Sequence, residues 1–278
     1  MQKKKYILII LLITFIIVVS FFSCLYIKAY FIEPLVFQKP ILCNKKDKIP
    51  AVLYKTGPHH DPPLDIQKLF KKIKLDNPEY KIIYYNDQQA RDFIKNNFSK
   101  TILTAYDNLI PGSYKADLFR YCILYKNGGL YGDLSQTYLV PLRQLVNRNN
   151  DVLVLIRDRL ISSFPKIFKH GIQISFIAAQ PKLSIFMKII NKIVENVKNK
   201  YYGSNPVDVT GPCLFRRILD KEDIPYRSEL ELNRDYIENI HTRQKVIKTK
   251  LSNHDKLIKK TSKNAYHKAW YKRHIYKN

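Results

Sequence analysis

The sequence predicts an α/β fold built around a largely parallel sheet. Short apolar runs alternate with segments of helical periodicity along residues 49–278. Hydrophobic residues make up 46% of the 278 residues and aromatic residues 13%, so the chain can bury a sizeable core. An amphipathic segment stops at Gly128-Gly129, and a short apolar run then ends at Asp133. Strands that alternate with helices are typical of a parallel sheet with both faces covered.

The expected elements follow this alternation along the chain. Strands are expected at 51–54, 80–85, 130–133, 151–156 and 172–178. Helices are expected at 65–74, 86–97, 114–127 and 182–198, with a short helix after Gly211-Pro212. Asn86-Asp87 can cap the second of these helices. The short helix leads into a mixed, basic C-terminal region.

The N-terminal segment predicts a membrane anchor. Residues 6–27 carry no charge and are rich in Ile, Leu, Val and Phe, which is long enough to cross the hydrocarbon core of a bilayer. No small-residue cleavage site follows, so we expect an uncleaved signal-anchor helix. Lys3–Lys5 favour a cytoplasmic N-terminus and a type II orientation, although lysines after the segment weaken this preference. The expected organisation is a tail and anchor over 1–28, a stem over 29–48 and one folded domain over 49–278.

The charge balance allows two interpretations. The formal net charge is +25, from 48 Lys and Arg against 23 Asp and Glu. Such a charge attracts anionic partners such as nucleic acid, lipid surfaces or phosphorylated substrates. Here the lysines are spread along the chain, and no zinc-finger, helix-turn-helix or RNA-recognition signature accompanies them, so solvated lysines are preferred and no nucleic-acid partner is expected. Four cysteines match neither a zinc site nor a dense disulfide framework.

Three charged residues around Gly128-Gly129 are candidates for chemistry. Asp117 and Arg120 are three residues apart on the expected helix and share a face. They are either a pair that binds the phosphate and ribose of a ligand or a plain surface ion pair. Asp133 ends the following strand, where it can hold Mg²⁺ or Mn²⁺ together with phosphate oxygens, or cap a turn. Ser135 stands where a second carboxylate would complete an Asp-x-Asp metal site. From these residues alone both interpretations stay open.

Several segments resemble glycosyltransferase family 32 in order. The segment from Tyr114 to Asp133, YKADLFRYCILYKNGGLYGD, is similar to the core of this family with its DXD sugar-binding region. The first strand with its loop and the second strand also fit, as do two later segments and the ending with His267 and Trp270. These further segments are 49–58, 77–87, 171–181, 209–212 and 267–276.

The resemblance implies a GT-A fold and a retaining transfer of a hexose from a nucleotide sugar, with Mn²⁺ or Mg²⁺ as cofactor. The donor would be a UDP- or GDP-hexose and the acceptor a glycan or glycolipid. The expected location is an ER- or Golgi-type membrane with the catalytic domain on the lumenal side, or a viral or host membrane. By position, the donor-binding residues would be Thr56, Gly57, Asp117, Arg120 and Trp270. The metal would be held by Asp133, which is also the catalytic residue, and by Ser135 and His267, with Asp208 on the acceptor side.

Ser135 and Ile174 depart from the family pattern. The family usually has Asp at the position of Ser135, and a hydroxyl adds no negative charge, so metal affinity or metal dependence is expected to fall. An Asn is common where Ile174 stands, so donor preference cannot be copied from relatives. A non-catalytic relative that binds sugar or nucleotide therefore stays an alternative, and a basic protein that binds membrane surfaces or nucleic acid is a third.

Overall fold

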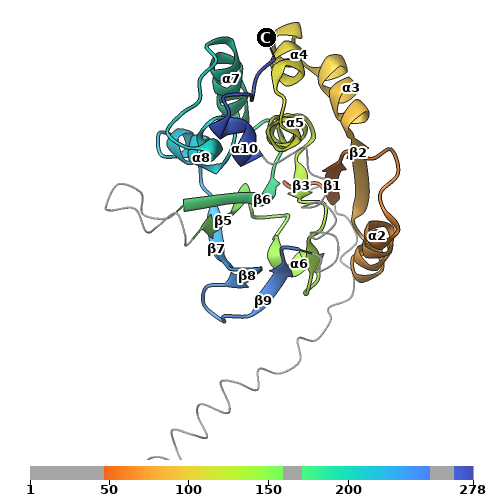
Figure 1. The fold of residues 1–278 in the computed structure, drawn as a ribbon. Helices are drawn as coiled ribbons and strands as arrows, with labels where there is room; N and C mark the ends of the chain where they lie inside the picture. Colours follow the sequence, from red (N-terminus) through yellow and green to blue (C-terminus); the bar gives the residue numbers. More distant parts are fainter. Residues whose placement is uncertain (1–46, 159–170, 251–265, 278) are drawn as a thin grey trace, which may run out of the picture. The chain divides into compact units, whose positions relative to one another are not determined.

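The computed structural model describes residues 47–158, 171–250 and 266–277, and these form a nine-stranded sheet with helices on both faces (Figure 1). The strand order is β2-β1-β3-β6-β5-β7-β8-β9-β4. The strands are β1 (Val52–Gly57), β2 (Lys81–Asn86), β3 (Gly129–Gly132), β4 (Thr137–Tyr138), β5 (Leu153–Asp158), β6 (Gly171–Ala179), β7 (Arg227–Asn233), β8 (Tyr236–Asn239) and β9 (Lys245–Lys248). The α-helices are α2 (Leu64–Asp76), α3 (Asp87–Asn97), α4 (Lys100–Asn108), α5 (Gly112–Asn127), α6 (Leu142–Leu145), α7 (Ser184–Lys198), α8 (Pro212–Leu219) and α10 (Tyr266–Tyr271), with a 3₁₀ turn, η2, at Pro206–Asp208.

The sheet is mixed, so the prediction of a mostly parallel sheet is wrong. Strand β1 is parallel to β2 and β3, and β5 is parallel to β7. Strand β6 instead runs antiparallel to both of its neighbours, β3 and β5. At the far edge of the sheet, β7, β8, β9 and β4 are each antiparallel to the next. Only two residues join β7 to β8, and so short a link can connect only antiparallel strands.

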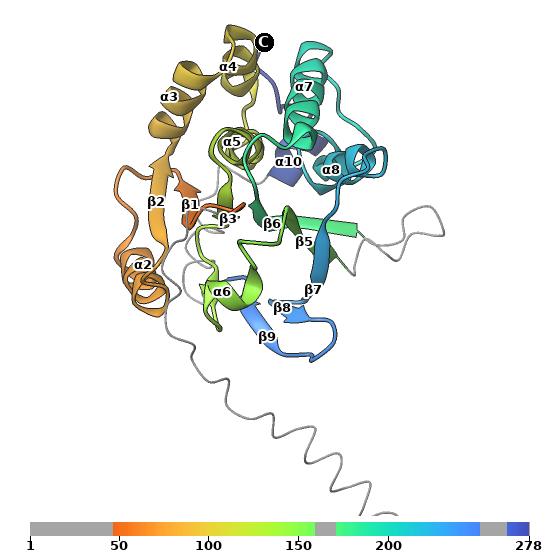
Figure 2. The same ribbon diagram turned by 180° about the vertical axis from the view of Figure 1, so that it is seen from behind.

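Two apolar layers pack on the two faces of the sheet. Neighbouring residues of one strand point to opposite faces, so Tyr54 and Tyr131 belong to one layer while Leu53 and Leu130 belong to the other. The first layer is covered by α3, α4, α5, α7 and α8, which lie together on one side of the sheet in both views (Figures 1 and 2). The second is covered by α2 and α6.

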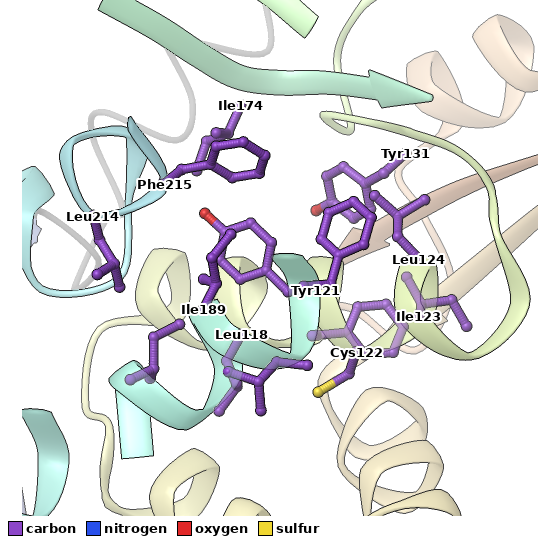
Figure 3. Packing of buried hydrophobic residues seen from close by; sticks show 14 of the residues in the cluster. Leu118, Tyr121, Cys122, Ile123, Leu124, Tyr131, Ile174, Ile189, Leu214 and Phe215 are labelled. Carbon is purple, nitrogen blue, oxygen red and sulfur yellow. The ribbon is translucent and has the colours of Figure 1, made fainter. Parts of the chain in front are cut away.

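Helix α5 lies at the centre of the first layer. Its apolar side chains from Leu118 to Leu124 are fully buried, and Figure 3 shows them packed among residues of α7 and α8. The helix ends where Gly128 adopts a φ of 64°, a left-handed conformation that favours glycine, as the sequence predicted. Because α5 is held on nearly all sides, the charged residues on its remaining face have fixed positions.

Most predicted elements are confirmed within a few residues, but α4, β4, α6 and the strands of the C-terminal region were not predicted. The mixed, basic region contains β7, β8 and β9, which extend the sheet. No helix among the described residues is long and apolar enough to cross a membrane. The predicted anchor at 6–27 lies outside the described residues, so it stays a prediction.

Candidate functional site

A cleft of about 640 Å³ opens on the first face of the sheet, beyond the carboxyl ends of β1 and β3. Its walls come from both ends of the chain. They include the β1 loop, α3, α4, the first half of α5, the end of β3, the end of β5, the first half of β6, the start of α8 and α10. Clefts at the carboxyl ends of strands are where α/β sheets commonly bind ligands.

Arg120 is the buried centre of the charged group in this cleft. Its Nη2 atom lies 3.4 Å from Asp117 Oδ1 and 3.2 Å from Asp133 Oδ1. Its Nη1 atom donates to the main-chain oxygen of Ile174 on β6, and the guanidinium lies 4.4 Å from the centre of the Tyr131 ring. Arg120 is only 5% exposed, so this charge is held by two carboxylates, a carbonyl and an aromatic face rather than by water.

Of the two carboxylates that face Arg120, Asp117 is more deeply buried than Asp133. Its side chain is 14% exposed, and its Oδ2 accepts a hydrogen bond of 2.8 Å from the Thr210 hydroxyl. Burial raises the pKa of Asp117 to about 6, while Arg120 and the Thr210 hydroxyl act in the opposite direction. Asp117 can therefore accept hydrogen bonds as a carboxylate at neutral pH and gains a proton in mildly acidic solution.

Asp133 presents its carboxylate to the cleft. Its side chain is 46% exposed, and its main-chain nitrogen donates to Ser175 O on β6 at 2.9 Å. Loss of hydration raises its pKa, and the charges of Arg120 and Lys55 oppose this shift. The residue thus has a fixed backbone and a side chain that a ligand can reach.

Lys55 lies on the other face of the sheet, directly under this turn. Its Nζ donates to Asp133 O at 2.8 Å and to the Tyr138 hydroxyl at 3.2 Å. Complete burial lowers the pKa of Lys55 to about 7, and Asp133 opposes the shift. Gly132 leaves room for this arrangement, because a side chain at that position would overlap the Tyr138 hydroxyl.

The structure brings five of the predicted site residues together. Thr56, Gly57, Asp117, Arg120 and Asp133 all line the cleft. They come from β1, α5 and the end of β3, which are far apart in sequence. They share one cleft, and their roles in donor binding and catalysis stay predictions.

The other four predicted residues do not line the cleft in the described part of the chain. Ser135 is half-buried in the turn after Asp133. His267 is exposed on α10 against the Tyr266 ring. The Trp270 indole donates to Tyr202 O at 2.6 Å.

The fourth of these residues, Asp208, is only 3% exposed and forms an ion pair with Arg217. It lines a separate small cavity of about 130 Å³, which shares Pro212 with the main cleft. The predicted acceptor-side carboxylate is therefore engaged by an arginine, and its role in binding an acceptor stays a prediction.

The donor set at Asp133 fits only a weakly held divalent cation. The described residues contain no group of three or more His, Cys, Asp or Glu side chains that could hold a metal ion. The reachable Asp133 carboxylate already faces Arg120, and Ser135 can add a neutral oxygen. Mg²⁺ and Mn²⁺ can complete such a set with phosphate and water oxygens.

Several residues that build the site have no role that the sequence predicts. Lys55 and Thr210 lie in segments that resemble the family, and Tyr131 lies within its core segment, but no chemistry was expected of them. One signal was present, because Lys55 directly follows the apolar run 51–54 at a position that strand alternation directs to the same face as Leu53, in the second layer. The contribution of Tyr266 depends on the packing of α10 beside α5, which no local pattern reveals.

Comparison with known proteins matches residues 63–152 to the glycosyltransferase sugar-binding region containing a DXD motif. The chain is 31% identical to inositol phosphoceramide mannosyltransferase 3 of Schizosaccharomyces pombe over 99 residues, which are 36% of this chain and 28% of that protein. It is 32% identical to the initiation-specific alpha-1,6-mannosyltransferase of Candida albicans over 79 residues, 28% of this chain and 20% of that protein.

A viral relative and a solved structure also match. The uncharacterized glycosyltransferase L373 of Acanthamoeba polyphaga mimivirus is 33% identical over 72 residues, 26% of this chain and 29% of that protein. Among solved structures, the PaToxG glycosyltransferase matches with a TM-score of 0.46 and 14% identity, over 63% of this chain and 70% of that one. The matched segments span less than a third of each curated relative. Residues 63–152 are therefore similar to the DXD-type sugar-binding region of glycosyltransferases.

Proposed function

We propose that this chain transfers a hexose from a UDP- or GDP-sugar to a glycan or glycolipid acceptor. One observation carries the proposal: Arg120 is held between Asp117 and Asp133 at the wall of a cleft of about 640 Å³. A buried arginine and a reachable carboxylate at the end of a strand suit a ligand that combines a diphosphate with hydroxyl groups. The matched sugar-binding region contains all three residues.

The residues of the cleft divide the proposed work between them. Thr56 and Gly57 sit at the end of β1, where they border the nucleotide. Asp117 accepts hydrogen bonds from sugar or ribose hydroxyls. Arg120 stabilises the negative charge that grows on the leaving diphosphate, in a site where it is preorganised by its buried contacts.

Asp133 and Ser135 would hold the divalent cation, Mn²⁺ or Mg²⁺. When bound, the cation would supply positive charge to the leaving diphosphate. Asp133 would then act by orienting this charge, because its main chain is fixed by Ser175 and Lys55 while its carboxylate reaches the cleft.

The finer parts of the proposal rest on the family resemblance. They are the GT-A fold and retention at the anomeric carbon. Anchoring by residues 6–27 in a type II orientation, with the catalytic domain on the lumenal side, rests instead on the uncharged apolar run and on Lys3–Lys5. Two of the relatives are mannosyltransferases, which favours nucleotide-linked mannose as the first donor to test. One of them is an inositol phosphoceramide mannosyltransferase, which favours a lipid-linked acceptor.

Turnover of nucleotide sugars tests this function. The full chain in detergent is assayed with a panel of UDP- and GDP-hexoses, with Mn²⁺ or Mg²⁺, for release of nucleoside diphosphate. We expect one donor to be consumed, and Asp133→Asn to lower kcat by at least about 100-fold because the reachable carboxylate is lost. Asp76→Asn, which alters an exposed carboxylate paired with Lys72, is the control. No turnover of any donor by the wild type, or full activity in Asp133→Asn, contradicts the proposal.

A non-catalytic relative that binds nucleotide or sugar is the second candidate, because Ser135 replaces a carboxylate of the metal motif. The Ser135→Asp variant separates the two functions. Turnover by the wild type rejects the non-catalytic function. Donor binding measured by calorimetry without turnover, in both the wild type and Ser135→Asp, supports it.

A further inference from the structure

A buried ammonium group lies beneath the turn that carries Asp133. Lys55 is 0% exposed, and strand alternation directs its side chain to the face opposite Thr56 and the cleft. Its Nζ contacts the Asp133 main-chain oxygen and the Tyr138 hydroxyl, and it lies 4.9 Å from the centre of the Tyr138 ring. The ammonium therefore holds the end of β3 from below without contact with solvent.

This lysine is costly to bury, because its partners are neutral. Among the described residues, no carboxylate lies within ion-pair distance of Lys55 Nζ; the bonded groups are a carbonyl and a hydroxyl. Fully buried lysines are rare unless an opposite charge compensates them. The nearby charge that acts on Lys55 is that of Asp133, whose carboxylate faces the cleft.

The sequence around the turn accommodates the ammonium group. A side chain on Gly132 would lie 3.2 Å from Lys55 Nζ and 3.0 Å from Gln136 Oε1, in addition to overlapping the Tyr138 hydroxyl. Gln136 is also 0% exposed, and its side-chain amide has no hydrogen-bond partner in the described structure. A glycine, a buried amide and a hydroxyl thus line the space that the ammonium occupies.

Asp117, Arg120, Asp133 and Lys55 form the α5–β3 corner, and their charges cancel when all four are ionised. Asp117 and Asp133 contribute two negative charges, and Arg120 and Lys55 contribute two positive ones when all four are ionised. Ser135 adds none. A corner with no net charge attracts a divalent cation less than a pair of free carboxylates does, and it repels a diphosphate less.

We propose that Lys55 is a built-in positive charge that replaces part of the charge of a divalent cation at Asp133. As a positioning residue it also fixes the main chain of the turn. The consequence is that this chain binds Mn²⁺ weakly and retains affinity for nucleoside diphosphates without metal. The nucleotide part of this inference rests on the proposed function.

Two binding measurements on the full chain in detergent test the inference. Electron paramagnetic resonance measures the affinity for Mn²⁺ alone, and calorimetry measures the affinity for UDP and GDP in EDTA. In Lys55→Met we expect Mn²⁺ to bind several-fold more tightly and the diphosphate about tenfold more weakly, because one unit charge is lost in a poorly screened site.

Two matched variants separate charge from packing. Tyr138→Phe removes a hydrogen-bond acceptor of Lys55 but keeps the lysine, which is protonated when binding is measured below its pKa of about 7, and Lys192→Met removes a surface charge that is paired with Glu195. We expect both to bind Mn²⁺ and diphosphate as the wild type does. If Lys55→Met fails to fold by circular dichroism, Lys55→Gln repeats the measurement with a neutral side chain that can still donate to the Asp133 carbonyl.

The outcomes separate this inference from the proposed function. Unchanged affinities in the lysine variant, or equal changes in Tyr138→Phe, overturn the role of the Lys55 charge. A wild type that binds neither UDP nor GDP, with Mn²⁺ or with EDTA, contradicts the proposed function instead. The measurement with Mn²⁺ alone still decides the role of Lys55 in that case.

Discussion

The α5–β3 corner and helix α10 both border the cleft, but they direct their polar side chains differently. At the corner, Asp117, Arg120 and Asp133 all line the cleft. In α10 only Tyr266 does, while the Trp270 indole donates to the main chain at Tyr202. The corner belongs to a helix buried on nearly all sides, whereas none of the six residues of α10 is buried.

This difference indicates what each region can contribute. Groups that stabilise charge need fixed positions in a poorly hydrated site, and the corner provides them through α5. A short helix at the margin offers a wall of aromatic side chains, such as Tyr266 beside Tyr114 with ring centres 5.8 Å apart. We therefore expect changes at the corner to affect catalysis strongly and changes in α10 to affect it weakly.

Arg120→Met should have the largest effect on both stability and activity. It leaves two carboxylates near each other without their shared counter-charge, and breaking a buried ion pair costs roughly 3–5 kcal/mol. We expect turnover to fall by more than about 100-fold, since a preorganised charge is lost. Urea unfolding measures the first effect and donor turnover the second.

Arg91→Met is the matched control, because Arg91 forms an ion pair of 2.7 Å with Asp107 whose two side chains are 36% and 32% exposed. Such a pair is worth at most about 1 kcal/mol. Equal losses of stability in the two variants would show that the buried charges of the corner stabilise the fold no more than an exposed ion pair does. The proposed difference between the corner and α10 would then be contradicted.

The helix and the strand of the corner could be predicted from sequence, and the reason is local. The helix, its glycine stop and the strand that ends at Asp133 are continuous in sequence, so spacing alone placed their charges on one side. The partners of these charges could not be predicted in the same way. Thr210 and Ile174 reach Asp117 and Arg120 through contacts that span 93 and 54 residues.

The sheet shows the same limit. The strands β1, β2, β3, β5 and β6 were predicted from their composition, but the direction of β6 depends on which strands become its neighbours. Strands β7 to β9 contain many charged residues, and their pattern is typical of exposed loops as much as of an edge meander. Tertiary pairing, rather than local preference, decides such segments.

Thr210→Val should have an intermediate effect that depends on pH. The variant loses the hydrogen bond of 2.8 Å to Asp117, and since Thr210 is 0% exposed this costs about 1–2 kcal/mol. That bond favours the ionised carboxylate, so its loss should raise the pKa of Asp117 above its present value of about 6. Donor affinity, measured by calorimetry from acid to neutral pH, should then fall at a higher pH than in the wild type.

The stability of the fold should depend on pH through the same group. Folding raises the pKa of Asp117 from 3.8 to about 6, so the folded state holds this proton more tightly than the unfolded chain. Asp117 therefore contributes stability below pH 3.8 that is lost as the pH rises through about 6. Thr249→Val, which removes an exposed hydroxyl bonded to Asp235, is the control. Identical pH profiles in the wild type and Thr210→Val would contradict this role.

Trp270→Phe should have the smallest effect, and it tests whether α10 takes part in donor binding. The variant keeps an aromatic ring and removes the N–H that donates to Tyr202 O, at a cost of about 1 kcal/mol. We expect the donor KM to change by less than about threefold, because the indole is engaged by the main chain and does not line the cleft. Tyr266→Leu, in the residue of α10 that does line it, should raise the donor KM more. A KM increase in Trp270→Phe that exceeds that of Tyr266→Leu, with stability unchanged, would place the indole in the donor site and make α10 a functional counterpart of the corner.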